Sequence, residues 1–118
     1  MNRPALNSPP LQLRANATWK PIADSGSLDI DPYQTIVVMD EAAADLLGFD
    51  QQRTIGYNVW DVLCTCLPAY HHQAVNSAIN NGERGVIRTR LSKLDVPVFL
   101  TLVPKGNGFT TITISKIS

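Results

Sequence analysis

The stretch QTIVVMDEAAADLLGFDQQRTIGYNVWDVL, residues 34–63, decides the fold of this chain. It begins with a short β-branched strand over residues 35–39. Three residues then suit the start of a helix and two glycines suit the end of one; the caps are Asp40, Asp50 and Asn58, and the stops are Gly48 and Gly56. Helices this short are not stable alone, so they must pack against something larger. The stretch therefore predicts a strand followed by three short helices that line one side of a pocket.

The bulk composition indicates one globular domain. The chain has 118 residues and a formal net charge of zero, so it lacks the basic field that would attract nucleic acid. No apolar run approaches the roughly 20 residues of a membrane span, and the N-terminus has no signal-peptide core. We therefore expect a cytoplasmic protein that binds neither nucleic acid nor membrane. Cys64 and Cys66 are too few for a zinc site, which needs four ligands.

The chain divides into an N-terminal arm, residues 1–26, and a regular domain, residues 27–118. Four prolines break the arm, which we expect to be partly flexible, with its apolar residues docked on the domain or on a partner. These apolar residues are Leu11, Leu13, Trp19 and Ile22.

The remaining patterns complete an α+β fold. Strands are predicted over 27–30, 35–39, 86–91, 96–103 and 110–117, and the longest helix over 68–81. Lys105-Gly106-Asn107-Gly108 is typical of a hairpin turn between the last two strands. Two strands, a helical crossover and a three-strand meander predict one five-stranded antiparallel sheet with short helices on one face.

This order of elements resembles the PAS domain family. The segments that carry the resemblance are VVMDEAAADLLGF, IGYNVWDVL, the helix ending in INNG, and the strands VPVFLTLVP and FTTITISKI. It implies a sensory module of a bacterial-type signal-transduction or transcription-regulating protein, with small-ligand sensing in a cavity between the sheet and the helices. It also implies a homodimer, here expected through the N-terminal arm and the sheet face, and a C-terminal output domain or partner protein. No catalytic set is apparent, so an enzyme is not expected.

The pocket candidates are residues of the short helices, the long helix and the sheet, namely Met39, Leu47, Trp60, Leu63, Val75, Ile79 and Phe99. Trp60 either stacks on a flat ligand or belongs to the core. The sequence alone does not decide which face of its strand Phe99 occupies.

His71 gives the first alternative function, a haem-binding gas or redox sensor. A helical projection places His71 on the apolar side of the long helix, where a histidine can ligate haem iron. The register resembles the H-x-x-Y-I helix of oxygen-sensing PAS domains, with Ala74 in place of tyrosine. Arg88 or Arg90 would then be the residue that hydrogen-bonds a bound gas. The default expectation is no cofactor, with a packed or solvated histidine.

Cys66 gives a minor alternative, a photosensor similar to photoactive yellow protein. Cys66 lies ten residues after Gly56, as the chromophore cysteine does after the matching glycine in that protein. The positions that should hold a chromophore phenolate are Met39 and Ala43, which cannot donate hydrogen bonds. A flavin-reactive cysteine is missing at its usual place, so flavin-adduct chemistry is disfavoured.

Overall fold

The computed structural model describes residues 23–94 and 96–117. Most of the predicted N-terminal arm therefore lies outside the described residues. The elements, in chain order, are β2 (Ser25–Ile30), β3 (Ile36–Met39), α1 (Glu41–Leu47), α2 (Gln51–Thr54), α3 (Val59–Cys66), η1 (Ala69–His71), α4 (His72–Asn81), β4 (Gly85–Arg90), β5 (Pro97–Gly106) and β6 (Phe109–Lys116).

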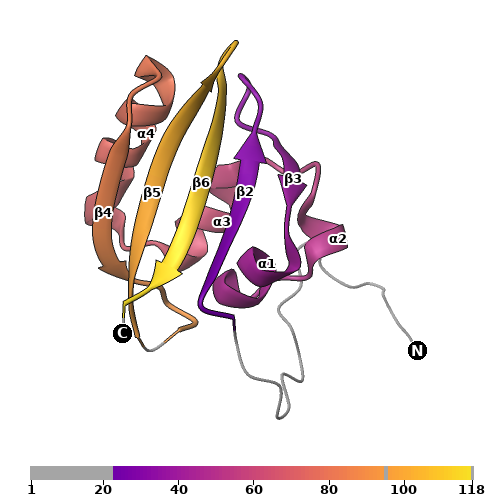
Figure 1. Cartoon of the computed structure of the whole chain (residues 1–118), viewed down its shortest axis with the longest axis vertical. Coiled ribbons are helices and arrows are strands. Elements are labelled where there is room, and N and C mark those ends of the chain that lie inside the picture. Colours follow the sequence, from indigo (N-terminus) through magenta and orange to yellow (C-terminus); the bar gives the residue numbers. More distant parts are fainter. Residues whose placement is uncertain (1–22, 95, 118) are drawn as a thin grey trace.

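The strands form one antiparallel sheet in the order β3-β2-β6-β5-β4. The helices between β3 and β4 cross behind this sheet and cover one of its faces (Figure 1). The predicted α+β fold, a five-stranded antiparallel sheet with short helices on one face, is confirmed. The first and last strands are neighbours in the middle of the sheet, so β3 and β4 form its two edges.

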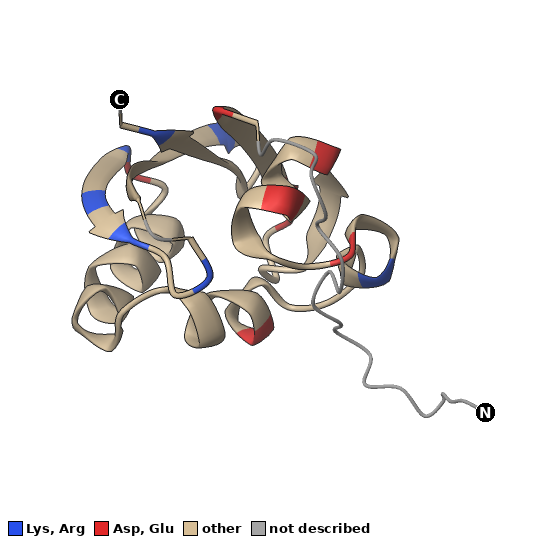
Figure 2. Ribbon diagram, turned by 90° about the horizontal axis from the view of Figure 1, so that it is seen from below, with Lys and Arg blue, Asp and Glu red and all other residues tan. Residues whose placement is uncertain are grey.

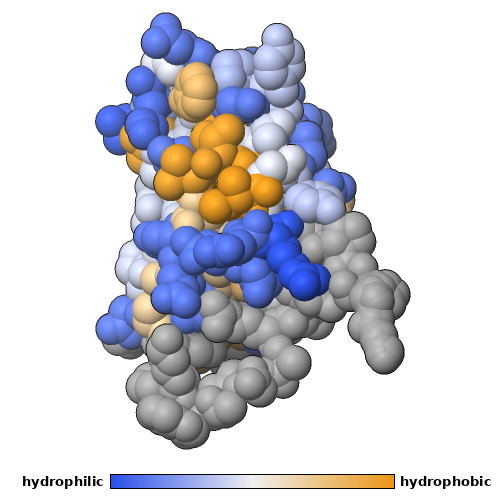
Figure 3. All heavy atoms as spheres, turned by 90° about the vertical axis from the view of Figure 1, so that its right-hand side faces the viewer, coloured by the Kyte–Doolittle hydropathy of each residue, from blue (hydrophilic) through white to orange (hydrophobic). Residues whose placement is uncertain are grey.

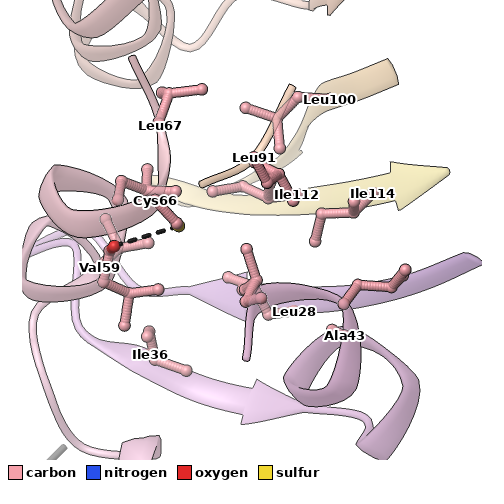
Figure 4. Packing of buried hydrophobic residues seen from close by; sticks show 14 of the residues in the cluster. Leu28, Ile36, Ala43, Val59, Cys66, Leu67, Leu91, Leu100, Ile112 and Ile114 are labelled. Atoms are coloured by element: carbon pink, nitrogen blue, oxygen red, sulfur yellow. Dashed lines mark hydrogen bonds between the residues drawn. The ribbon is translucent and has the colours of Figure 1, made fainter. Parts of the chain in front are cut away.

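The register assigns each strand residue to a face. Leu28 lies opposite Ile112, and Leu100 lies opposite Ile114, all fully buried under the helices. The alternate residues face away from the helices, because side chains in a strand alternate between faces. Figure 4 shows the inner side chains packed against those of α1 and α3. This single cluster is the hydrophobic core of the domain.

The three predicted caps of the short helices are all present. The Asp40 carboxylate accepts the Ala43 N–H at 2.7 Å, and Asp50 accepts the N–H groups of Gln52 and Arg53. Asn58 Oδ1 accepts the N–H of Trp60 at 2.9 Å. Each bond satisfies an amide that the helix geometry leaves without a partner.

Gly26 determines how closely α1 approaches the sheet. An added Cβ at this position would collide with the backbone of Ala42 and Ala43, in the first turn of α1. Asp40 also accepts the Ser27 N–H, at 3.1 Å to its nearer oxygen, and so ties the start of α1 to β2. Only glycine permits both contacts.

The long helix predicted over 68–81 is interrupted, which corrects the prediction of one continuous helix. A 3-10 turn, η1, occupies Ala69–His71, and α4 begins at His72. Neither Pro68 nor His71 supplies a side-chain cap for the helix that follows it. The chain here changes from a tight turn to an α-helix without the local hydrogen bonds that begin α1, α2 and α3.

The hairpin between β5 and β6 is confirmed. Gly106 lies opposite Phe109, and both turn residues have positive φ, 56° for Asn107 and 84° for Gly108. This geometry, with positive φ at both central residues, matches the twist of the flanking strands.

Candidate functional site

The chain around β4 approaches the α3–η1–α4 segment at two places. At one end, the Ser92 N–H donates to the Cys66 carbonyl oxygen at 2.9 Å. At the other end, a Cβ built on Gly85 would lie 3.8 Å from the Ala78 Cβ. Along the sequence, His71 lies between Cys66 and Ala78, and Thr89 lies between Gly85 and Ser92. The helix α4 itself packs mainly against β5.

Three polar side-chain atoms of α3, η1 and β4 are buried without a partner among the described residues. Trp60 Nε1, His71 Nε2 and Thr89 Oγ1 are buried and make no hydrogen bond within the part of the chain that the structure describes. A buried polar group left without a partner costs roughly 1–3 kcal/mol. Such groups are rare in native interiors, and they indicate where a bound water or ligand is accommodated.

The two adjacent histidines differ in their surroundings. The His72 ring lies at 5.3 Å, edge-on, from Trp60, and its Nε2 lies 2.8 Å from the Leu67 carbonyl oxygen. Because a carbonyl can only accept, His72 Nε2 must carry the proton. The His71 ring contacts Tyr70 at 4.3 Å, and its buried Nε2 remains without a partner. His71 is therefore a partly buried histidine whose Nε2 is inaccessible and has no partner among the described residues.

Thr89 is the site residue that sequence reasoning missed. It lies on the inner face of β4, opposite Val98, and is 6% exposed. Arg88 and Arg90 lie on the opposite, outer face, so the expectation that one of them meets a gas in the interior is wrong. The sequence did contain a signal for this burial. Two arginines two residues apart share the solvent-exposed face of a strand, so the residue between them points to the opposite, inner face.

Most predicted pocket residues lie together in the core. Trp60 is partly buried and packs against this cluster, which includes five of the predicted residues; these are Met39, Leu47, Leu63, Val75 and Ile79. Phe99 is a correction, because it is 41% exposed and lies opposite Arg88 and Ser115 on the outer face of the sheet. The period of two in β5 places Val98, Leu100 and Leu102 inside and leaves Phe99 outside.

Two depressions lie at the surface of the helical layer and at one end of the sheet. The first, of about 310 Å³, is lined by Trp60, His72, Gln73 and Asn76. The second, of about 320 Å³, lies between the end of α4 and the β5–β6 hairpin, and its walls include Ile79, Asn81 and Phe109. Neither lining includes an Asp, Glu, Lys or Arg side chain.

Cys66 is buried and chemically protected. Burial raises the pKa of its thiol to about 12, although a bond to the backbone and the charge of Lys93 act in the other direction. The thiol donates to the Val62 carbonyl oxygen at 3.2 Å (Figure 4). A thiol with this pKa is almost entirely protonated at neutral pH and is a poor nucleophile. Met39 and Ala43, which are also buried, offer no donor to a chromophore, so these observations speak against the Cys66 photosensor.

Charges of opposite sign are partly separated across the domain, although Lys105 pairs with Asp29 and Lys116 pairs with Asp24. Figure 2 shows acidic residues around α1 and basic residues along β4. Asp40, Glu41 and Asp45 belong to the α1 region, and Arg88 and Arg90 belong to β4. No helix among the described residues is long and apolar enough to cross a membrane.

Comparison with known proteins identifies the class. The PAS fold family matches residues 15–110, most of the chain, and the chain belongs to this family. The match begins within the predicted N-terminal arm, and β2 begins at Ser25, two residues before the predicted domain start at residue 27. A search of curated protein sequences found no significant match.

Solved structures share the fold at low sequence identity. The PAS domain of the RpfR quorum-sensing receptor of Cronobacter turicensis, in complex with C12:0, is similar with a TM-score of 0.60 and 17% identity, over 81% of this chain and 96% of that one. The photoactive yellow protein domain of the sensor histidine kinase Ppr of Rhodospirillum centenum gives 0.60 and 20%, over 80% and 86% of the two chains. The PAS domain of nitrogen regulation protein NR(II) of Vibrio parahaemolyticus gives 0.56 and 12%, over 79% and 89%. The chain is thus a PAS domain, similar in fold to domains of signalling proteins.

Proposed function

We propose that this PAS domain is the sensory module of a bacterial-type, cytoplasmic signal-transduction or transcription-regulating protein, and that it senses a small ligand held between the sheet and the helices. PAS domains generally act as regulatory modules rather than enzymes. The buried atoms His71 Nε2 and Thr89 Oγ1, neither of which has a hydrogen-bond partner among the described residues, support the proposal most directly.

The chemistry of this region defines the class of ligand. Val75 and Ile79 on α4 and Leu63 on α3 supply apolar side chains, while His71 and Thr89 each supply one polar atom. A ligand with an apolar body and one hydrogen-bonding group would satisfy both kinds of surface. The RpfR domain, similar in fold, was solved in complex with C12:0 and with BDSF, which makes a fatty acid a reasonable first probe.

Thermal unfolding with dodecanoic acid as the probe tests the proposal. A ligand that binds only the folded domain raises its Tm with increasing concentration. We expect this rise in the natural chain and a clear reduction of it in both His71→Leu and Thr89→Val. Thr101→Val, on the outer face of the sheet, is the matched control and should retain the full rise. The absence of any Tm shift with dodecanoic acid, together with no small molecule detected by native mass spectrometry of the purified chain, would contradict the proposal.

A haem sensor is the second candidate function, because the free Nε2 of His71 is a ring nitrogen suited to ligate iron. On β4, the polar side chain on the inner face of the sheet is that of Thr89, whereas Arg88 and Arg90 lie on the outer face. The absorption spectrum of the purified chain tests this candidate. A Soret band that is lost in His71→Ala and kept in His72→Ala would support it, and a colourless protein after growth with added haem would exclude it.

We also propose a homodimer formed through the N-terminal arm and the outer sheet face, which passes the signal to a C-terminal output domain or a partner protein. The outer face carries the exposed apolar residues Phe99 and Val86, 41% and 65% exposed, on neighbouring strands. Light scattering of Phe99→Ser should give a smaller mass than the natural chain. Tyr33→Ser, in the turn between β2 and β3, is the control, and equal masses for Phe99→Ser and the natural dimer would remove this face from the interface.

A further inference from the structure

The two edges of the sheet differ in how their backbone groups are used. At the β3 edge, the chain between α2 and α3 covers the strand. The Gly56 N–H donates to the Ile36 oxygen at 2.8 Å, and the Ile36 N–H donates to the Tyr57 oxygen at 2.9 Å. Gln51 Nε2 donates to the Met39 oxygen at 2.7 Å. Figure 3 shows this side of the domain, with hydrophobic atoms gathered on it. An incoming strand would therefore find β3 already hydrogen-bonded.

The β4 edge is open in the part of the chain that the structure describes. All residues of β4 pair with β5 in one antiparallel register without a shift. In such a pair, every second residue directs its N–H and C=O away from the neighbouring strand. Among the described residues, the backbone of residues 85–89 bonds only to β5, and α4 packs mainly against β5 rather than along β4. The outer edge of β4 is therefore a template on which another strand can be added.

Arginines follow this edge on the outer face of the sheet. Arg84, directly before β4, and Arg88 and Arg90 within it are all exposed, and alternation places them on the same face as Val86. The segment 84–93 contains no acidic residue. We call the three arginines the arginine row. A strand that pairs with β4 would have its own outer-face side chains next to this row.

The arginine row disfavours a second copy of β4 as the added strand. Residues that lie opposite each other in a sheet have side chains on the same face, so an antiparallel pairing of β4 with itself can shift only in steps that keep the arginines on one face. The registers that overlap at least half of β4 place Arg84 opposite Arg88, Arg84 opposite Arg90, Arg88 opposite Arg88, or Arg88 opposite Arg90. Like charges directly opposite destabilise the pair. Residues 1–22 contain no acidic residue either, so their composition does not complement the row.

We propose that the β4 edge accepts an added strand from a partner protein, and that this strand carries Asp or Glu at alternate positions. The outward backbone groups of β4 supply the hydrogen bonds of the added strand. Carboxylates opposite Arg84 and Arg88 form cross-strand ion pairs and select the partner. The added strand lies in the plane of the sheet, so the proposal depends neither on the ligand nor on the homodimer proposed above.

An NMR titration of the full chain with a synthetic peptide tests this. The probe is a short capped peptide in which glutamate alternates with threonine, and the control peptide has lysine in place of glutamate. We expect the glutamate peptide to shift the amide resonances of β4 and to slow their hydrogen exchange. Arg88→Glu should weaken its binding by about fivefold or more, because an opposite-charge pair becomes a like-charge pair. Arg84→Glu, which lies outside the strand, should also weaken binding and replaces Arg88→Glu if that variant does not fold.

Arg53→Glu is the matched control variant. Arg53 is exposed on α2, which lies at the covered β3 edge, and the substitution makes the same change in net charge. It should leave binding of the glutamate peptide unchanged. A loss equal to that of Arg88→Glu would show that only the overall charge attracts the peptide, and would overturn the proposal.

Four further results would overturn it. The first two are no shift of the β4 resonances at millimolar glutamate peptide, and equal binding of the lysine peptide. The third is a set of shifts centred on Phe99 and Thr101, which would place the peptide on the outer face instead of the edge. The fourth is protection of the β4 amides that rises with protein concentration in the absence of peptide, which would assign the edge to a second copy.

Discussion

The side of the domain built from α1, α2 and α3 differs from the side built from η1, α4 and β4 in how its polar groups are satisfied. The first three helices each begin with a side-chain cap, and the buried Thr54 hydroxyl donates to the Asp50 carbonyl oxygen at 2.6 Å. On the other side, η1 and α4 begin without a side-chain cap. His71 Nε2 and Thr89 Oγ1 also have no partner among the described residues.

We interpret the side built from α1, α2 and α3 as a structural scaffold, and the side built from η1, α4 and β4 as the candidate site. Satisfied polar groups hold the short helices in one position at little cost, whereas unsatisfied buried groups lower stability unless something else binds them. Natural proteins retain such costs mainly where function requires them. We therefore expect substitutions on the capped side to destabilise the domain, and selected apolar substitutions on the α4–β4 side to stabilise it.

Gly26→Ala should cause the largest loss of stability, because Gly26 lies where β2 and α1 approach each other most closely. The new Cβ meets backbone atoms of α1 rather than a flexible side chain, so the helix must move. We expect a loss of about 3 kcal/mol in the free energy of unfolding, measured by urea denaturation. Gly85→Ala is the matched control: its Cβ makes only ordinary contacts, with Leu102 at 3.5 Å. Equal losses of unfolding free energy in the two variants would show that the close approach of α1 to Gly26 is not important for stability.

Asp40→Ala should have the next largest effect. It removes the cap of α1 and the bonds to the Ser27 N–H together, for a loss of about 2 kcal/mol. Asp40→Asn keeps an acceptor for the cap and should lose less than half as much. Urea denaturation again gives the values, and an unchanged stability in Asp40→Ala would contradict the importance of the caps.

The histidine pair should respond with opposite signs. His71→Leu removes a buried nitrogen without a partner, and we expect a gain of about 1 kcal/mol in unfolding free energy. His72→Leu breaks the contact with the Leu67 carbonyl and should lose about the same amount. Both variants should be compared in chain purified without bound ligand. Losses in both would mean that the His71 ring is already satisfied in the folded domain.

The buried threonines test the same comparison with the smallest change of shape. Thr89→Val should be neutral or stabilising by less than about 1 kcal/mol, because the hydroxyl that it removes has no partner. Thr54→Val should destabilise by about 1 kcal/mol, because it removes the hydroxyl bond to the Asp50 carbonyl and leaves that oxygen only the Thr54 N–H, at 3.1 Å. Matched thermal unfolding curves would show the difference, and a larger loss in Thr89→Val than in Thr54→Val would reverse our assignment of the two sides.

The sequence by itself determined the fold class, the three caps and the hairpin. Asp40, Asp50 and Asn58 act within their own helical turns, so spacing along the chain is enough to find them. The alternation in β5 and β6 likewise depends only on neighbours two residues apart.

Only the tertiary structure decided which faces and atoms meet. A strand pattern says that Phe99 and Leu100 lie on opposite faces, but the helices decide which face is covered. The break at η1 and the free Nε2 of His71 depend on packing between segments far apart in the sequence. So does the burial of Thr89, because the pairing of β4 with β5, in which Thr89 lies opposite Val98, turns its side chain to the inner face of the sheet. The physical reason is the sequence separation of the interacting residues. Caps and turns form between near neighbours in the sequence, whereas the site forms from residues that are far apart in the sequence.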